Sequence, residues 1–208
     1  HYLGCKANAY ETEAMQHLLE EACYEIVPFT QKADVYVINT CSVTNMADRK
    51  SRQMLHKAKK NNPDSIVVAA GCYVQTSEKE VLNDLSVDIV IGNDRKHDLV
   101  RLLEEYSLDS VNDTVDDIND GKHDFEELFI DQTKEHTRAF IKVQDGCNQF
   151  CSYCIIPYAR GRVRSRRFEN VIAEVERLAA NGFKEVVLTG IHLSSYGVDF
   201  EAATGLLE

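Results

Sequence analysis

One compact cysteine motif constrains this chain more than any other feature. It directly follows a predicted strand at Ala139–Val143 and consists of Cys147, Cys151 and Cys154. Thiolates are the preferred ligands of iron–sulfur clusters, and a short loop can bind one cluster with three of them. Structural zinc normally takes four ligands, and the nearest further candidates, His136 and His192, lie outside the loop. The spacing therefore favours an iron–sulfur cluster with one iron open to a substrate or cosubstrate, with zinc or three buried free thiols as alternatives.

Composition is compatible with a reducing compartment. Hydrophobic residues make up 44% of the 208 residues, but no run approaches the roughly 18 apolar residues of a membrane span. No secretory leader is recognisable either, so we expect a cytoplasmic protein that does not enter a membrane. Seven cysteines in such a protein are more often metal ligands or catalysts than disulfides. The segment Tyr2–Cys5 resembles the end of a strand, and we expect the chain to be a fragment.

The net charge of −11 is unevenly distributed. Residues 104–136 contain 12 acidic and two basic side chains, whereas residues 1–103 and 137–208 are nearly neutral. Acidic runs of this kind are usually solvated linkers. We therefore predict a linker at 107–136, with one short strand near Glu127–Ile130, and draw no conclusion about partners from the charge.

The first block, residues 1–106, alternates between helices and short apolar runs. Strands are predicted at Asp34–Asn39, Ser65–Gly71 and Asp88–Ile91. Helices are predicted at Glu11–Cys23, Thr44–Lys60, Thr76–Leu85 and Asp94–Tyr106. Strands separated by helices predict an α/β fold with a parallel sheet and right-handed crossovers.

The second block, residues 137–208, repeats the strand, loop, helix and strand order. Its elements are the strand Ala139–Val143, the cysteine loop, the helix Asn170–Ala180 and the strand Glu185–Thr189. This order predicts the start of a (β/α) partial barrel or of another wound sheet. His192 follows the last strand, where barrel enzymes place site residues, although a packing or surface histidine is an equal alternative.

Three further cysteines share a position in the first block. Cys5, Cys41 and Cys72 each follow the end of an inferred strand. Because the carboxyl ends of parallel strands converge on one crevice, these thiols predict a second three-ligand site. The alternative is that they are small buried hydrophobic residues. Cys23 lies on the apolar face of a predicted helix, and we expect it to belong to the core.

Basic residues are concentrated in two places. Five arginines follow the cysteine loop: Arg160, Arg162, Arg164, Arg166 and Arg167. They could contact phosphate close to the site, or they could form a solvated turn. The basic residues of the helix Thr44–Lys60 are more simply explained as an exposed face.

The cysteine motifs resemble those of a known family. Cys-x3-Cys-x2-Cys is similar to the signature of the radical S-adenosylmethionine (SAM) superfamily, and QDGCNQFCSYCIIPYARG at 144–161 resembles the methylthiotransferases within it. Three further stretches resemble the N-terminal domain of the methylthiotransferases: GCKANAYE at 4–11, NTCSVT at 39–44 and GCY at 71–73. The resemblance covers most of the chain outside the acidic segment.

The resemblance implies the cofactors and the reaction. A [4Fe–4S] cluster on Cys147, Cys151 and Cys154 would bind SAM, with Tyr153 near the adenine, and its reduction would cleave SAM to a 5′-deoxyadenosyl radical. A second [4Fe–4S] cluster on Cys5, Cys41 and Cys72 would carry the sulfur to be inserted. An external electron donor is implied, as are most of a barrel and a C-terminal RNA-binding module outside this chain. We therefore do not expect this chain alone to bind RNA or to be active.

The family has branches with different substrates. The Gly-Cys-Lys-x-Asn-x-Tyr-Glu stretch at 4–11 and the Asn-Thr-Cys-Ser-Val-Thr stretch at 39–44 resemble most the branch that adds a methylthio group to carbon 2 of threonylcarbamoyladenosine, next to the anticodon of tRNA. The alternatives are isopentenyladenosine in tRNA and an aspartate of a ribosomal protein. Outside the family, a zinc-binding structural or regulatory protein would use the same thiols without catalysis.

Overall fold

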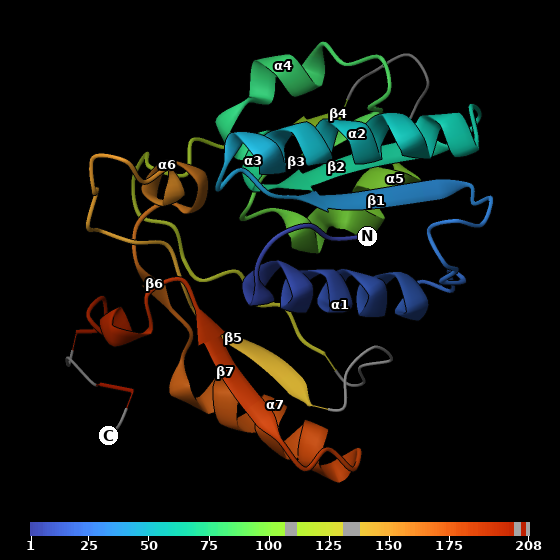
Figure 1. The fold of residues 1–208 in the computed structure, drawn as a ribbon. Coiled ribbons are helices and arrows are strands. Elements are labelled where there is room, and N and C mark those ends of the chain that lie inside the picture. Colours follow the sequence, from blue (N-terminus) through green and yellow to red (C-terminus); the bar gives the residue numbers. More distant parts are fainter. Residues whose placement is uncertain (107–111, 131–137, 202–204, 207–208) are drawn as a thin grey trace.

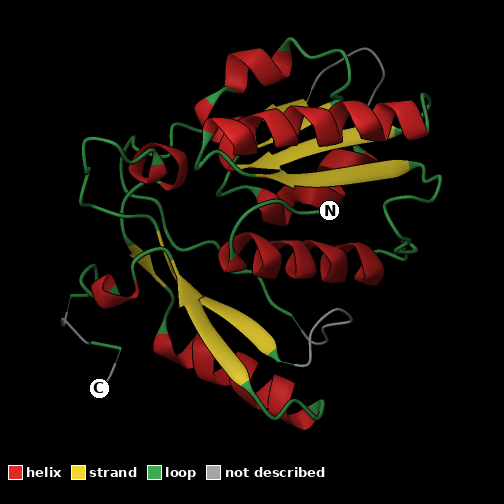
Figure 2. Ribbon diagram, viewed as in Figure 1, coloured by secondary structure: helices red, strands yellow, loops and turns green. Residues whose placement is uncertain are grey.

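The computed structural model describes residues 1–106, 112–130, 138–201 and 205–206, with only the backbone of 112–114 described. These residues form two α/β units with a sheet in each (Figures 1 and 2). The predicted fold class, a parallel α/β domain followed by the start of a radical SAM-type α/β region, is confirmed. No described helix is long and apolar enough to cross a membrane.

The first sheet has four parallel strands in the order β1-β2-β3-β4. They are β1 (Val35–Thr40), β2 (Ile66–Gly71), β3 (Ile89–Ile91) and β4 (Asn112–Thr114). The first three are the predicted apolar runs, and buried parallel strands need such runs because both of their faces are covered. On the free edge of β1, Tyr2 forms an isolated parallel bridge with Asn39, which brings the segment before Cys5 to the same end of the sheet.

Helices cover both faces of this sheet (Figure 2). The elements are α2 (Asn45–Asn61), α3 (Cys72–Thr76), α4 (Glu78–Leu82), the 3₁₀ turn η1 (Lys96–Asp98) and α5 (Leu99–Glu104). Helix α2 begins after Thr44, whose hydroxyl accepts a hydrogen bond from the Ala47 amide at 3.1 Å, as an N-cap residue does. The single helix predicted at Thr76–Leu85 is wrong, because helix begins directly after Gly71 and is interrupted at Ser77.

Helix α1 (Lys6–Glu21) lies between the two units (Figure 1). Every residue from Ala7 to Met15 is buried, which an ordinary one-sided surface helix would not show. Met15 and Leu19 pack against the first sheet, whereas Tyr10 and Ala14 pack against the second sheet. The helix therefore supplies a core face to each unit.

The second sheet has the strand order β6-β5-β7. Strand β5 (Ala139–Asp145) pairs in parallel with β7 (Val186–Gly190) and antiparallel with β6 (Arg164–Ser165). Strand β6 was not predicted from the sequence. The remaining elements are α6 (Ile156–Arg160), α7 (Phe168–Ala180) and the 3₁₀ turn η2 (Leu193–Ser195). Helix α6 packs against α3, so the segment after the cysteine loop reaches the first unit.

The acidic segment is more structured than a solvated linker. Its residues 112–114 form β4, and Ile118, Leu128 and Ile130 are buried. The strand predicted near Glu127–Ile130 is wrong, since these residues belong to no strand. Leu128 and Ile130 pack in the core around the second sheet, and β4 pairs with β3 of the first sheet, which the overall acidity of the segment concealed. The rest of the predicted linker, 107–111 and 131–137, lies outside the described residues.

The prediction for Cys23 is also wrong. This residue follows the end of α1 with a φ of 66°, and it is exposed. Helix α1 ends at Glu21, two residues before the helical pattern predicts, so the cysteine leaves the apolar face and belongs to the turn.

Candidate metal centres

Two of the first group of cysteines lie at the carboxyl ends of neighbouring strands, as predicted, whereas Cys5 follows only the isolated bridge at Tyr2. Cys41 follows β1 and Cys72 begins α3 directly after β2, and both are buried, while Cys5 is exposed. Burial raises the pKa of the Cys41 thiol, the Val43 backbone lowers it, and the Cys72 and Cys5 thiols raise it further. The three sulfur atoms therefore share one electrostatic environment.

Two glycines make this convergence possible. Gly4 and Gly71 have φ values of 101° and 96°, in the region that favours glycine. A Cβ atom on Gly4 would lie 2.7 Å from Cys41 Sγ, and one on Gly71 would overlap Asn39 and lie 2.6 Å from the Thr40 carbonyl oxygen. The chain thus turns sharply before Cys5 and before Cys72, and the missing side chain of Gly4 avoids a clash with Cys41.

The second group lies in the loop between β5 and α6. The loop is held at its start by a hydrogen bond from the Cys147 amide to the Gly161 carbonyl, 3.0 Å, and at its end by one from the Cys154 amide to the Cys151 carbonyl, 2.9 Å. Cys151 is exposed, and Cys147 and Cys154 are half-buried. All three sulfur atoms come from a segment ordered by its own backbone bonds.

Aromatic side chains surround this loop. Tyr153 is 91% exposed and Tyr158 is 56% exposed. The Phe150 ring meets Tyr158 edge-on with centroids 5.4 Å apart, and the Arg162 guanidinium stacks on Phe150 at 4.3 Å. Tyr153 thus presents a free ring beside Cys154, where a planar ligand could stack.

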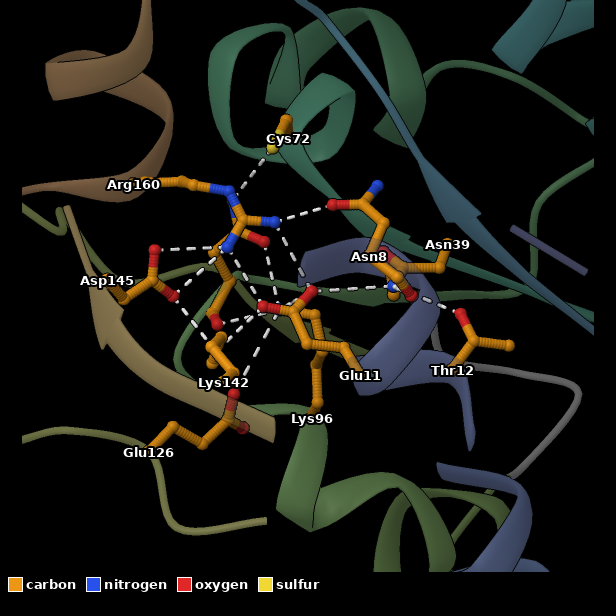
Figure 3. Close-up of polar contacts among 12 residues, drawn as sticks. Asn8, Glu11, Thr12, Asn39, Cys72, Lys96, Glu126, Lys142, Asp145 and Arg160 are labelled. Atoms are coloured by element: carbon orange, nitrogen blue, oxygen red, sulfur yellow. Dashed lines mark hydrogen bonds and ion pairs between the residues drawn. The ribbon is translucent and has the colours of Figure 1, made fainter. Parts of the chain in front are cut away.

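A buried polar network connects the two groups (Figure 3). Arg160 of α6 donates to Glu11 of α1 at 2.9 Å and to Asp145 of β5 at 3.0 Å, and Lys142 pairs with the same two carboxylates at 2.8 and 2.9 Å. Burial alone would raise the carboxyl pKa values, but Arg160 and then Lys142 hold the pKa values of Glu11 and Asp145 well below their usual range. The network therefore stays ionised inside the protein.

This network has no local sequence signature, because Glu11 and Arg160 are 149 residues apart. Glu11 begins the predicted helix Glu11–Cys23 and Asp145 follows the predicted strand Ala139–Val143, but no local pattern marks either residue as buried. Buried charges almost always pair with one another, so each of them required a cation from elsewhere in the chain.

The arginine cluster serves mainly the interior. Arg160, Arg164 and Arg166 are buried, whereas Arg162 and Arg167 are exposed. The expectation of phosphate contacts is therefore wrong for the three buried side chains. Arg166 forms a second link between the units, since it contacts Glu174 of α7 and donates to the Tyr10 hydroxyl of α1 at 3.3 Å.

His192 is partly buried and has local partners. Its Nδ1 atom lies 2.6 Å from the Ser195 hydroxyl, and its backbone amide donates to the Gln144 side chain at 2.7 Å. Gln144 lies next to Asp145 in β5, so this turn also supports the start of the cysteine loop. These contacts are consistent with a packing role.

The donor chemistry of both cysteine groups suits a thiolate-bound cluster. Among the residues that the structure describes, no three His, Cys, Asp or Glu side chains lie close enough to hold one ion. A cubane cluster is larger than an ion, so its ligands stand further apart. The seven cysteines form no disulfide, and thiolates are the donors that such clusters require.

The chain matches two family descriptions. Residues 1–92 match Uncharacterized protein family UPF0004, and residues 141–204 match the Radical SAM superfamily. The fold resembles a solved structure of the radical SAM methyltransferase TsrM from Kitasatospora setae, with a TM-score of 0.58 and 16% sequence identity. The alignment covers 89% of this chain and 45% of the TsrM chain. At this identity the likeness concerns the fold alone.

Sequence relatives are more specific. The chain is 46% identical to the threonylcarbamoyladenosine tRNA methylthiotransferase MtaB of Bacillus subtilis, over 97% of this chain and 45% of that protein. It is 46% identical to the protein of the same name from Aquifex aeolicus, over 95% of this chain and 48% of that protein. A tRNA-2-methylthio-N(6)-dimethylallyladenosine synthase from Thermoanaerobacter is 35% identical, over 95% of this chain and 43% of that protein.

Fold, motif and relatives agree on the class: this is a radical SAM protein, for which the superfamily implies SAM and a [4Fe–4S] cluster. Within that class, the chain belongs to the radical SAM methylthiotransferase family. The chain spans about half the length of the curated relatives it matches.

Proposed function

We propose that the protein is a tRNA methylthiotransferase that modifies carbon 2 of threonylcarbamoyladenosine next to the anticodon. The observation that carries this proposal is the presence of two separate three-cysteine groups joined by one buried polar network. A radical SAM protein needs only the loop group, so the second group calls for a further function. Sulfur donation from a second [4Fe–4S] cluster supplies one.

The chain's own residues would divide the work between the two groups. Cys147, Cys151 and Cys154 would hold the cluster that binds SAM, and the exposed Tyr153 ring would stack near the adenine. When loaded, the loop group would support SAM cleavage and the first cysteine group would supply the sulfur atom. SAM would also supply the methyl group, and an external donor would supply the electrons.

The second cluster would be held by Cys5, Cys41 and Cys72. The positions of Cys41 and Cys72 at neighbouring strand ends and the close approach of Gly4 to Cys41 support a shared site for these three thiols. Helices α3 and α6 pack together. Cys72 is the first residue of α3, and the second cysteine loop leads into α6, so this packing supports a short path between the two cysteine groups.

The relatives support the choice of branch. Two proteins named for threonylcarbamoyladenosine match at 46% identity, and one named for dimethylallyladenosine matches at 35%. The acceptor in tRNA is thus best assigned as threonylcarbamoyladenosine.

The test uses the full-length protein, reconstituted anaerobically with iron and sulfide. It is supplied with SAM, a low-potential reductant and tRNA carrying either threonylcarbamoyladenosine or isopentenyladenosine, and the nucleosides are analysed by mass spectrometry. Methylthio product from the first tRNA alone supports the proposal. Product from the second tRNA alone assigns the other branch, and no product from either tRNA with both clusters loaded contradicts a tRNA substrate.

A further inference from the structure

Arg160 belongs to the second unit, but its side chain extends into the first (Figure 3). It ends α6, is fully buried, and donates through Nη2 to the Asn8 side-chain oxygen at 2.5 Å. The same oxygen of Asn8 lies 3.7 Å from Cys5 Sγ, which donates to it. One guanidinium from the radical SAM unit thereby reaches the loop that carries the first cysteine.

The same side chain also interacts electrostatically with Cys72. Burial alone would lower the pKa of Arg160 itself, but Asp145 and then Cys72 raise it well above its usual value. Arg160 thus reaches the first group through Asn8, the hydrogen-bond partner of Cys5, and through its interaction with Cys72.

Asn93 completes this environment. Its side-chain amide lies 3.6 Å from Cys72 Sγ and 2.6 Å from the carbonyl of Ala159, the residue before Arg160. Both are donor contacts, and Asn93 is 1% exposed. An N–H group of the first unit therefore points at a cysteine sulfur while it is held in place by the second unit.

The buried network that contains Arg160 has one more cation than it has carboxylates. Four cations face three carboxylates: Lys96, Lys142, Arg160 and Arg164 against Glu11, Glu126 and Asp145. The Nε and Nη1 atoms of Arg164 have no hydrogen-bond partner. A buried charge without a counter-charge is costly. Arg160 carries the positive charge of this network to Asn8, the hydrogen-bond partner of Cys5, where an anionic group such as a thiolate-bound iron–sulfur cluster would be favoured.

We propose that Arg160, assisted by Asn93, sets the electron affinity of the iron–sulfur cluster at Cys5, Cys41 and Cys72; this rests on the second cluster of the proposed function. Reduction adds one negative charge to the cluster. A nearby cation and an N–H donor to a ligand sulfur both stabilise that charge, and net charge and hydrogen bonds are known determinants of cluster potentials. The reduction of the first site thus depends on a positioning residue of the second unit.

The experiment measures the midpoint potential of this cluster alone. The full-length protein carries Cys147→Ala, Cys151→Ala and Cys154→Ala, so that only the first site can load. Anaerobic titration with dithionite and redox mediators is followed by electron paramagnetic resonance. We expect Arg160→Gln to reduce the equilibrium constant for one-electron reduction at least tenfold, a shift of about 59 mV to lower potential.

Three further variants separate tuning from packing. Arg160→Lys keeps the charge and should restore most of the shift. Asn93→Asp removes the N–H donors and should lower the potential as well. Arg166→Gln is the matched control, because Arg166 is also a buried arginine that links α1 to the second unit but has no cysteine among its described contacts, and it should leave the potential unchanged.

Each outcome decides one claim. Unchanged potentials in Arg160→Gln and Asn93→Asp, or an equal shift in Arg166→Gln, overturn the inference while the second cluster stands. If Arg160→Gln does not fold, the result with Asn93→Asp decides the question. If the parent protein loads no iron at the first site, the second cluster of the proposed function fails, and the tuning role fails with it.

Discussion

Cys147, Cys151 and Cys154 come from one short loop, whereas Cys5, Cys41 and Cys72 come from the start of α1 and two strand ends, spread over 68 residues. The loop is held by its own backbone hydrogen bonds and is largely accessible. The strand-end group exists only when β1, β2 and α1 have assembled, and two of its thiols are buried. Local sequence can therefore build the first kind of site, but the second kind requires the complete fold.

The largest expected effect comes from removing one ligand of either group. In the reconstituted full-length protein, Cys151→Ala should lose about four irons per chain and all SAM cleavage. Cys41→Ala should lose the same amount of iron, keep SAM cleavage and stop sulfur insertion. Iron analysis measures cluster content, and detection of 5′-deoxyadenosine measures SAM cleavage. Loss of SAM cleavage in Cys41→Ala would contradict separate roles for the two cysteine groups.

The next effect concerns the network that joins them. Glu11→Gln leaves Arg160 and Lys142 buried with a weaker partner, and breaking a buried pair in this way costs about 3–5 kcal/mol. Urea unfolding should report this loss. Glu21→Gln on the same helix is the control, since Glu21 is exposed and its loss should change stability by less than about 0.5 kcal/mol. Equal effects of the two substitutions would argue against the network.

A substitution at Gly71 should damage only the strand-end group. Gly71→Ala adds backbone strain of order 1–3 kcal/mol and brings a Cβ against Asn39 and the Thr40 carbonyl. Gly182→Ala is the matched control, because Gly182 has a φ of 94° but no atom within 4 Å of the added Cβ. We expect iron loss at the first site in Gly71→Ala alone. Full iron loading in that variant would show that the turn tolerates a side chain.

Acid should loosen the junction between the units. Folding lowers the pKa values of Glu11 and Asp145 from 4.5 and 3.8, so at low pH the unfolded chain binds more protons than the folded chain. Their stabilisation is complete above these ordinary values and is lost as the pH falls through the lowered ones. Unfolding measured from pH 7 to 3 should show stability falling with pH, with a shallower slope in Glu11→Gln; a parallel slope would contradict this origin.

The smallest expected effect lies at the loop's surface. Tyr153 is 91% exposed, so Tyr153→Ala should change stability by less than about 0.5 kcal/mol. Its ring should instead stack on the adenine, and SAM should bind up to about tenfold more weakly, which corresponds to about 1.4 kcal/mol. Calorimetric titration of SAM measures this, with unaltered affinity as the opposing result.

Sequence patterns predicted the parts of this molecule that have local signals. Apolar runs located β1, β2 and β3, and the position of each cysteine after a strand predicted its place at the sheet edge. Strand β4 was missed because Asn112–Thr114 has no apolar run. Partial burial of the acidic segment was missed because single apolar residues such as Ile118 and Leu128 carry it.

The charged network was beyond local reasoning. The run of arginines was visible, but which of them point inward depends on carboxylates from α1, β5 and α7. Arg160 and Arg166 are buried with their carboxylate partners. Arg162 stacks on Phe150 and is exposed. Only the assembled fold brings these groups together.

The most direct test of two cluster sites is the iron and acid-labile sulfide content of the full-length protein after anaerobic reconstitution. We predict about eight irons and about eight sulfides per chain, with a broad absorption band near ~400 nm, as two cubane clusters require. About four irons would leave the loop site alone and contradict a cluster at Cys5, Cys41 and Cys72. Zinc without iron would contradict both.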